Sequence, residues 1–364
     1  MHLTIPILSS LSSLLTLTIA VPAPAPVKAT RLVPRIRGFE WYNYTTIPGF
    51  FLQDDLSTNP SGFDYKMGSL GATTNLGLIN RTYDTDDENR PDWTQWQKFE
   101  HYVWRLNRGS GRNVQYKVLY LGRHGEGYHN VAENYYGTEL WNCYWSLVDG
   151  NGTSVWADAR VTPNGIAQAE KANAFWANSI KTTKIPLPES YYTSPLTRCL
   201  QTANLTFASL PLPGGKPFNP TVKEFFREGI SGHTCDRRST KSYIQSSFPR
   251  YNIESSFTER DELFRPLFAE GSSNQDIRSK AVLDDVFDSD DSTFFSVTIH
   301  SGAINSLLRV LGHRPFRLET GQIIPVLVKA EVVLKDEPVR VETPWSRIET
   351  CALPPGATEP IPGL

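Results

Sequence analysis

The sequence predicts an α/β fold, a three-layer αβα sandwich that follows an N-terminal extension. From about residue 114 to residue 350, short β-like runs alternate with segments of helical periodicity. Three of those runs lead into a turn of charged or polar residues and then into a helix pattern. The chain has 364 residues, 39% of them hydrophobic, which is enough to fill a sizeable core and excludes a disordered protein.

The chain before residue 114 is expected to wrap over a core that is formed elsewhere. Residues 38–90 are rich in loop-forming residues and aromatic clusters and show no long periodic pattern. Asp92 is the expected N-cap of a helix. Three- and four-residue spacing gives this helix an apolar stripe of Trp93, Trp96, Phe99, Val103 and Leu106.

The predicted catalytic domain, residues 114–350, contains the alternating elements. Strands are expected at residues 116–121, 191–193, 294–299 and 323–334. Helices are expected at residues 163–178, from residue 195, and at residues 280–287 and 303–311. Residues 351–364 form a C-terminal tail.

Positive and negative residues nearly balance, so no electrostatic field of one sign covers the whole molecule. The 36 Lys and Arg residues and 38 Asp and Glu residues sum to −2, so neither nucleic-acid nor membrane-surface binding is expected. A small anionic substrate needs only a local group of cations and remains compatible with this composition.

The N-terminus has the composition of a cleaved secretory signal, residues 1–20, followed by the extension at residues 21–113. Residues 5–20 are uncharged and rich in Leu, Ser and Thr, and Thr18 and Ala20 give small residues at a cleavage site. A membrane anchor is the alternative, but the run is short and interrupted by polar residues. We therefore expect a secreted protein with no membrane attachment after cleavage. Its sequons allow N-glycans at Asn43, Asn80, Asn151 and Asn204.

The four cysteines leave two interpretations open. In an oxidising compartment they allow three complete disulfide pairings, and the sequence does not choose among them. Free buried thiols are the other interpretation, because a chain of this length does not need disulfides to fold. The cysteines are Cys143, Cys199, Cys235 and Cys351.

The three strand–turn–helix segments carry residues suited to phosphoryl transfer. Ligands of open α/β sheets bind beyond the carboxyl ends of the strands, where these turns should converge. Arginines fit phosphate oxygens, histidines can act as nucleophile and charge stabiliser, and a carboxylic acid can protonate a leaving oxygen. The turns contain Arg123-His124-Gly125, Ser194-Pro195-Leu196-Thr197-Arg198 and His300-Ser301-Gly302, and a fourth cluster contains Glu228, His233 and Asp236.

In this order the motifs resemble the histidine phosphatase superfamily, on its phosphoglycerate-mutase-like branch. The resemblance covers residues 114–315 and is closest to fungal phosphomutase-like proteins that share the signature Arg-His-Gly-x-Gly-x-His-Asn, here residues 123–130. It implies a phosphoglycerate-mutase-like fold, a phospho-accepting His124, a proton donor Glu228 and a second pocket histidine, His300. It also implies substrate-binding residues, which are Arg123, Gly125, Asn130, Arg198, Ser301 and Gly302.

Two features leave alternatives open. His300 is followed by Ser301 and not by Asp, so the chain does not resemble the acid-phosphatase and phytase branch, in which that Asp is the donor. Glu126 and Asp236 therefore compete with Glu228 for this role. His129 and His233 are candidates to line the pocket. No metal is expected, with a zinc site of His124, His129 and His300 as the alternative.

These residues predict a secreted phosphomonoester phosphatase that acts through a phosphohistidine and needs no cofactor. Its partner is a small-molecule phosphate ester. Protonation of His124 at low pH and ionisation of Glu228 at high pH predict a bell-shaped pH profile. Two alternatives are a phosphomutase of the same superfamily and a non-catalytic secreted protein that binds phosphate esters or carbohydrate.

Overall fold

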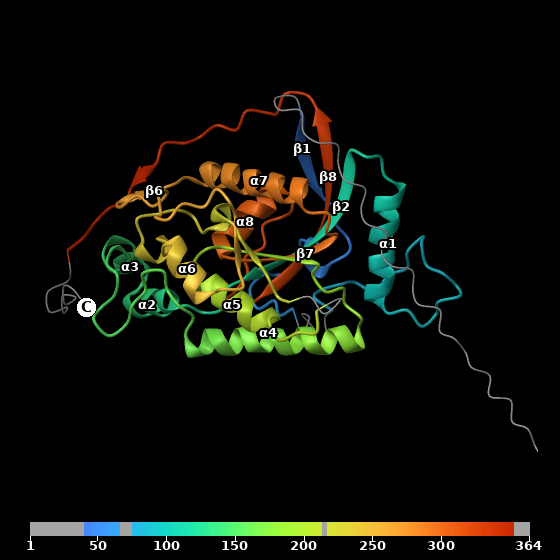
Figure 1. The fold of residues 1–364 in the computed structure, drawn as a ribbon, viewed down its shortest axis with the longest axis horizontal. Helices are drawn as coiled ribbons and strands as arrows, with labels where there is room; N and C mark the ends of the chain where they lie inside the picture. The colour runs from blue at the N-terminus through green and yellow to red at the C-terminus, as the bar shows by residue number, and fades with distance from the viewer. Residues whose placement is uncertain (1–39, 66–74, 213–216, 353–364) are drawn as a thin grey trace, which may run out of the picture.

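A computed structural model describes residues 40–65, 75–212 and 217–352, and its centre is a mixed sheet (Figure 1). Within these residues the sheet has seven strands in the order β1-β8-β2-β7-β3-β4-β5. Strand β8 pairs antiparallel with β1 and β2, and the remaining pairs are parallel. The strands are β1 (Glu40–Thr46), β2 (Val114–Arg123), β3 (Ser190–Thr193), β4 (Thr221–Val222), β5 (Asn252–Ile253), β7 (Phe294–Ile299) and β8 (Ile323–Leu334).

Helices cover both faces of the sheet and complete the predicted three layers (Figure 1). On one face, Tyr120 of β2 contacts Trp96 and Trp176, which belong to α1 and α4. On the other face, Phe295 of β7 contacts Phe287 of α7. The first layer contains α1 (Gln95–Gly109), α4 (Pro163–Thr182) and α5 (Thr197–Phe207), and the second contains α7 (Ser272–Ser289) and α8 (Ser301–Val310).

The remaining elements are short and lie around this sandwich. Two helices and a 3-10 turn that follow β2 enclose a second apolar cluster, built mainly from Trp141, Trp145 and Trp156. The short helices are α2 (Tyr128–Tyr136), α3 (Thr138–Cys143) and α6 (Lys241–Ser247). The 3-10 turns and outer strands are η1 (Leu52–Asp54), η2 (Trp145–Leu147), η4 (Glu224–Phe226), η5 (Thr234–Asp236), β6 (Phe268–Ala269) and β9 (Ser346–Arg347).

The N-terminal segment differs from the expectation of a wrap, because residues 40–46 form an edge strand of the sheet itself. Tyr42, Tyr44 and Thr46 are buried and alternate with exposed residues, which is the period of a half-buried strand. The expected N-cap, Asp92, is also wrong. Thr94 begins α1, because its hydroxyl accepts from the N–H of Gln97 and the Gln97 side chain accepts from the N–H of Thr94.

One disulfide, between Cys143 and Cys351, fastens the C-terminal segment to α3. After β8 the chain returns across α7, and β9 pairs with β6 before that disulfide (Figure 1). Cys199 and Cys235 are buried free thiols, so the four cysteines are neither all paired nor all free.

The predicted signal peptide and most of the predicted tail lie outside the described residues. In the part of the chain that the structure does describe, no helix has the length and apolar character needed to cross a bilayer.

Candidate active site

The carboxyl ends of three parallel strands bring the predicted motifs together. Strand β7 lies between β2 and β3 in the sheet, and the three strands end at Arg123, Ile299 and Thr193. The next residue of β2 is His124, whose ring centroid lies 5.1 Å from that of His300, the residue that follows β7. The turns that follow β2 and β7 therefore converge, as the sequence predicts.

His124 is a buried, neutral imidazole. Its Nδ1 lies 2.7 Å from the carbonyl oxygen of Gly125. Because a carbonyl only accepts hydrogen bonds, Nδ1 carries the proton and Nε2 keeps its lone pair. Burial, followed by the charges of Arg198 and Arg123, holds the pKa of His124 well below 6.5. An unprotonated Nε2 is the form required for nucleophilic attack.

Gly125 allows the His124 loop to lie directly against α4. A Cβ on Gly125 would be 2.4 Å from the carbonyl oxygen of Gly165. The N–H of Gly125 donates to Oγ1 of Thr202 on α5, at 2.9 Å. The loop is therefore held from two helices. Gly125 has a role in this support, beside the substrate contact that the sequence predicts for it.

The two predicted phosphate arginines enter from β2 and from the first turn of α5. Arg198 is buried, and its Nη1 donates to the carbonyl of Cys235 at 2.6 Å while Nη2 lies 3.3 Å from Oδ1 of Asp236. Nη1 of Arg123 donates to the carbonyl of Leu318 at 2.8 Å. The Nε atoms of both arginines are buried without a hydrogen-bond partner among the described residues, so each guanidinium keeps a donor that an anionic ligand could accept.

Glu228 is held by two backbone N–H groups. Oε1 accepts from Gly229 at 2.9 Å, and Oε2 accepts at 3.0 Å from Gly302 in the first turn of α8. Burial, followed by the nearby Asp236, raises the pKa of Glu228 above 4.5. A raised pKa suits a carboxyl group that must carry a proton to a leaving oxygen.

Gly302 therefore holds Glu228 instead of presenting its N–H to a ligand. A Cβ on Gly302 would be 2.2 Å from Oε1 of Glu228, so only glycine allows the carboxylate to reach this N–H without rearrangement. Ser301, predicted with it as a substrate contact, is the first residue of α8.

The two competing carboxylates have other partners. Asp236 accepts from Arg198 through Oδ1 and from the hydroxyl of Ser231 through Oδ2, at 3.0 Å. Oε1 of Glu126 accepts from the hydroxyl of Thr162, the N-cap of α4, at 2.7 Å. These contacts favour Glu228 as the proton donor.

The other predicted residues have more varied surroundings. Nε2 of His300, a fully buried residue, is 2.8 Å from the hydroxyl of Ser194, a contact that the sequence does not predict. Oδ1 of Asn130 accepts from the N–H of Gly127 at 2.9 Å and closes the turn into α2. The ring of His233 lies 6.3 Å from that of Trp141, at the edge of the second apolar cluster.

The structure gives no support to a metal site of His124, His129 and His300. Among the described residues, one group of at least three potential ligands has its donor atoms within 4.8 Å of one another, and it is His233, Cys235 and Asp236. Both carboxylate oxygens of Asp236 already accept hydrogen bonds, and Cys235 lies in the second apolar cluster. We therefore assign no metal to this group.

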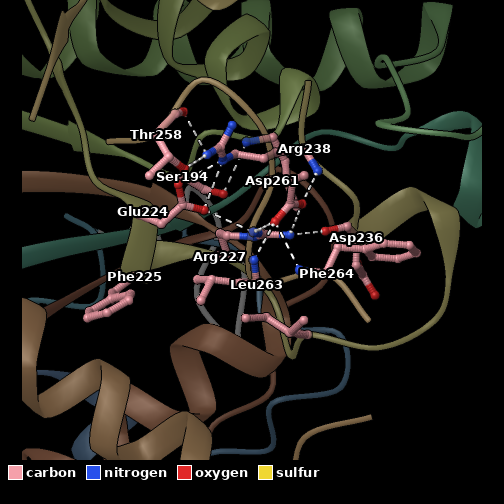
Figure 2. Close-up of polar contacts among 12 residues, drawn as sticks. Ser194, Glu224, Phe225, Arg227, Asp236, Arg238, Thr258, Asp261, Leu263 and Phe264 are labelled. Carbon is pink, nitrogen blue, oxygen red and sulfur yellow. Dashed lines mark hydrogen bonds and ion pairs between the residues drawn. The ribbon is translucent and has the colours of Figure 1, made fainter. Parts of the chain in front are cut away.

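A buried network of charged residues supports the wall of the site that carries Asp236 (Figure 2). Both terminal nitrogens of Arg227 donate to the carboxylate of Asp261 at 2.7 Å, and Nη1 also donates to Glu224 at 2.9 Å. Nη2 of Arg227 donates to the carbonyl of Asp236. Arg238 donates through Nε to Glu224 at 2.7 Å and through Nη2 to the carbonyl of Thr258 at 2.9 Å.

Comparison with known proteins agrees with this geometry. The chain is 52% identical over 291 residues to a protein of Arthroderma benhamiae named probable phosphoglycerate mutase, an alignment that covers 79% of this chain and 85% of that one. This chain belongs to the histidine phosphatase superfamily. The model of branch 1 of this superfamily matches residues 145–323, C-terminal to the His124 loop.

Two further proteins are similar to this chain at lower sequence identity. Phosphomutase-like protein 3 of Candida albicans is 38% identical over 244 residues, which is 66% of this chain and 74% of that one. The crystal structure of phosphoglycerate mutase from Thermus thermophilus is 19% identical, with 57% of this chain and 91% of that chain covered and a TM-score of 0.32. Membership shows the predicted phosphoglycerate-mutase-like fold and supports catalytic phosphoryl transfer.

Proposed function

We propose that this protein is a secreted phosphomonoester phosphatase that works through a phosphohistidine at His124. One observation carries the proposal. The Nδ1–H of His124 is directed at the Gly125 carbonyl, so a nucleophilic Nε2 remains beside two arginines whose Nε atoms have no partner among the described residues.

In the first half-reaction, Nε2 of neutral His124 attacks phosphorus in line with the ester oxygen. The N–P bond forms, the P–O bond to the leaving group breaks, and the carboxyl proton of Glu228 moves to the departing oxygen. Arg123, Arg198 and His300 stabilise the phosphoryl oxygens, and the Gly125 carbonyl accepts from the Nδ1–H of the now positive imidazole.

In the second half-reaction, water attacks the phosphorus of phosphohistidine. Glu228, now a carboxylate, takes a proton from the water, a new P–O bond forms and the N–P bond breaks. Inorganic phosphate leaves, and His124 and Glu228 return to their starting protonation states.

Secretion is supported by three features. They are the uncharged stretch at residues 5–20, the Cys143–Cys351 disulfide, and exposed sequon asparagines at Asn43, Asn80 and Asn204. Asn151 is only partly exposed, and its amide donates to the hydroxyl of Tyr136. Expression in a glycosylating host, followed by mass spectrometry of the medium, tests both cleavage after Ala20 and glycan attachment.

Phosphate release from a panel of alkyl, sugar and aryl phosphomonoesters tests the activity, with His124→Ala as the matched variant. We expect release by the wild type, no release by the variant, and an acid-labile phosphoryl group on His124 after rapid quenching. A folded wild-type protein that releases no phosphate from any ester would exclude the phosphatase. Phosphate binding without turnover would support the non-catalytic alternative.

A phosphomutase is the second candidate, and the names of the relatives from Arthroderma benhamiae and Candida albicans favour it. In that reaction the phosphoryl group of His124 returns to a hydroxyl of the substrate and not to water. Phosphorus NMR of the same reactions distinguishes the two, because a mutase gives a phosphorylated isomer and a phosphatase gives inorganic phosphate.

A further inference from the structure

His129 occupies a place beside the nucleophile that the proposed mechanism does not use. It lies in the first turn of α2 and is 9% exposed. Its ring centroid is 5.4 Å from that of His124, close to the 5.1 Å that separates His124 from His300. The nucleophile therefore has an imidazole neighbour on each of two elements.

The two neighbours differ in how their nitrogens are satisfied. Nε2 of His300 has a partner in the hydroxyl of Ser194. Nδ1 of His129 is buried and has no hydrogen-bond partner among the described residues. Buried polar atoms are nearly always paired in folded proteins, so such an atom next to a reactive centre indicates a missing partner. Burial, with Arg198 and His124, holds the pKa of His129 well below 6.5, and a neutral imidazole keeps one N–H donor.

The backbone before α2 makes room for this ring. Gly127 is the N-cap of α2, with φ −104°, a conformation that any residue can adopt. A Cβ at this position would nevertheless be 2.6 Å from Nδ1 of His129. Glycine is needed here for the position of the imidazole and not for the conformation of the chain.

We propose that His129 is a third histidine of the phosphoryl pocket. Its N–H donates a hydrogen bond to an oxygen of the phosphoryl group as that group moves to and from His124. His129 stays neutral and transfers no proton. This inference rests on the proposed function, because it needs a phosphoryl group on His124.

Three variants test the role. His129→Phe keeps a flat aromatic ring and removes the donor, and it should lower kcat/KM for phosphate release about 100-fold. His129→Gln restores an N–H donor and should recover part of that loss. Gly127→Ala should displace the ring and reproduce much of the loss of kcat/KM seen in His129→Phe. The double variant with both substitutions should lose no more kcat/KM than His129→Phe alone. Gly109→Ala, where a Cβ meets nothing within 4 Å, is the matched control and should behave as the wild type.

Binding of orthovanadate and inorganic phosphate, measured by calorimetry, separates a contact with the phosphoryl group from a structural role. We expect His129→Phe to weaken the binding of orthovanadate more than the binding of phosphate, because bound orthovanadate resembles the five-coordinate transition state. A variant with a lower Tm but wild-type kcat/KM and anion affinities would overturn the inference. Additive losses in the double variant would equally contradict it.

The same measurements keep the two proposals apart. A wild type that releases no phosphate contradicts the proposed function, whatever the variants do. Anion affinity then still reports on His129, and equal affinities of the wild type and His129→Phe would refute its contact with the phosphoryl group.

Discussion

The phosphoryl pocket and the buried charge network beside it share Asp236 but balance their charges differently. In the network, Arg227 forms ion pairs with Asp261 and Glu224, so two carboxylates compensate its positive charge. In the pocket, Arg198 has one carboxylate contact among the described residues, at 3.3 Å, and its histidine neighbours are neutral. The comparison teaches that the number of buried arginines does not mark a functional site. What distinguishes the pocket is the smaller number of carboxylates around its buried arginine, because positive charge that is less compensated can bind an anion.

The largest expected effect is that one variant in each region changes a different property: catalysis in the pocket and stability in the network. Arg198→Met should lower kcat/KM by about 100- to 1,000-fold, because the phosphoryl oxygens lose a cationic donor in the transition state. Arg238→Met should leave kcat/KM of the folded protein unchanged. It should lower the free energy of unfolding by about 3–5 kcal/mol, because Glu224 becomes a buried charge with less compensation. Steady-state kinetics and urea denaturation of both variants give the answer, and loss of kcat/KM in folded Arg238→Met would break the distinction.

A second effect, about 10-fold or more, is expected at the junction of Glu228 and α8. Gly302→Ala would put a methyl group against the carboxylate of Glu228, so proton donation should suffer. Alkyl phosphates, whose leaving oxygens need a proton, should lose more activity than aryl phosphates, whose leaving groups are more acidic. Glu228→Gln is the matched variant and should show the same dependence on the leaving group. Equal losses on both ester types would argue against Glu228 as the acid.

The pH dependence sharpens the contrast, with effects of a few-fold. The pKa of His124 lies well below 6.5, so its Nε2 stays unprotonated in mild acid, and the raised pKa of Glu228 keeps its acid form above pH 4.5. The bell-shaped profile of kcat/KM should therefore have its acid limb below pH 6.5. An acid limb at or above pH 6.5 in the wild type would contradict a buried, neutral nucleophile.

The same shifts predict how stability changes with pH. In the unfolded chain, the three pocket histidines take up protons as pH falls through 6.5, whereas in the folded chain they remain neutral. The unfolded state then binds more protons than the folded state. The free energy of unfolding should therefore decrease as the pH decreases through this window. Urea denaturation above and below pH 6.5 measures this slope, and His129→Phe should reduce it.

The smallest effect on catalysis is expected far from the pocket, at the C-terminal disulfide. Cys351→Ser should leave kcat/KM unchanged and lower the free energy of unfolding by about 2–4 kcal/mol, because it releases a link between residues 208 positions apart. Wild-type protein under a mild reductant should behave in the same way. A drop in kcat/KM would instead show that the disulfide supports the site.

The sequence predicted elements whose signal is local. Strands at residues 294–299 and 323–334 agree with β7 and β8 residue for residue, because apolar β-like runs need no distant partner to be recognised. His124 and His300 each directly follow a strand of the sheet, β2 and β7. The same reasoning missed β1, although Tyr42 and Tyr44 alternate with exposed residues, because the aromatic clusters around them resemble a loop-rich segment.

Contacts between distant residues could not be predicted. The hydrogen bond from Gly302 to Glu228 joins residues 74 positions apart, and Arg198 meets Asp236 across 38 positions. The residue spacing within each motif gives no information about these contacts between distant residues. The role of Gly302 in holding the acid, and the choice among three carboxylates, therefore depend on the folded chain.

The strand order has a consequence for how the protein is made. Strand β8, from near the end of the chain, lies between β1 and β2, from its first third. During synthesis the two early strands have no shared partner until residues 323–334 have left the ribosome. Ribosome-bound chains that stop before β8 would leave β1 without a partner and one edge of β2 unpaired, and unpaired edges are templates for association with other chains. Folding of the sheet is therefore expected to follow translation and to be slow, because its pairings join segments that lie at opposite ends of the described chain.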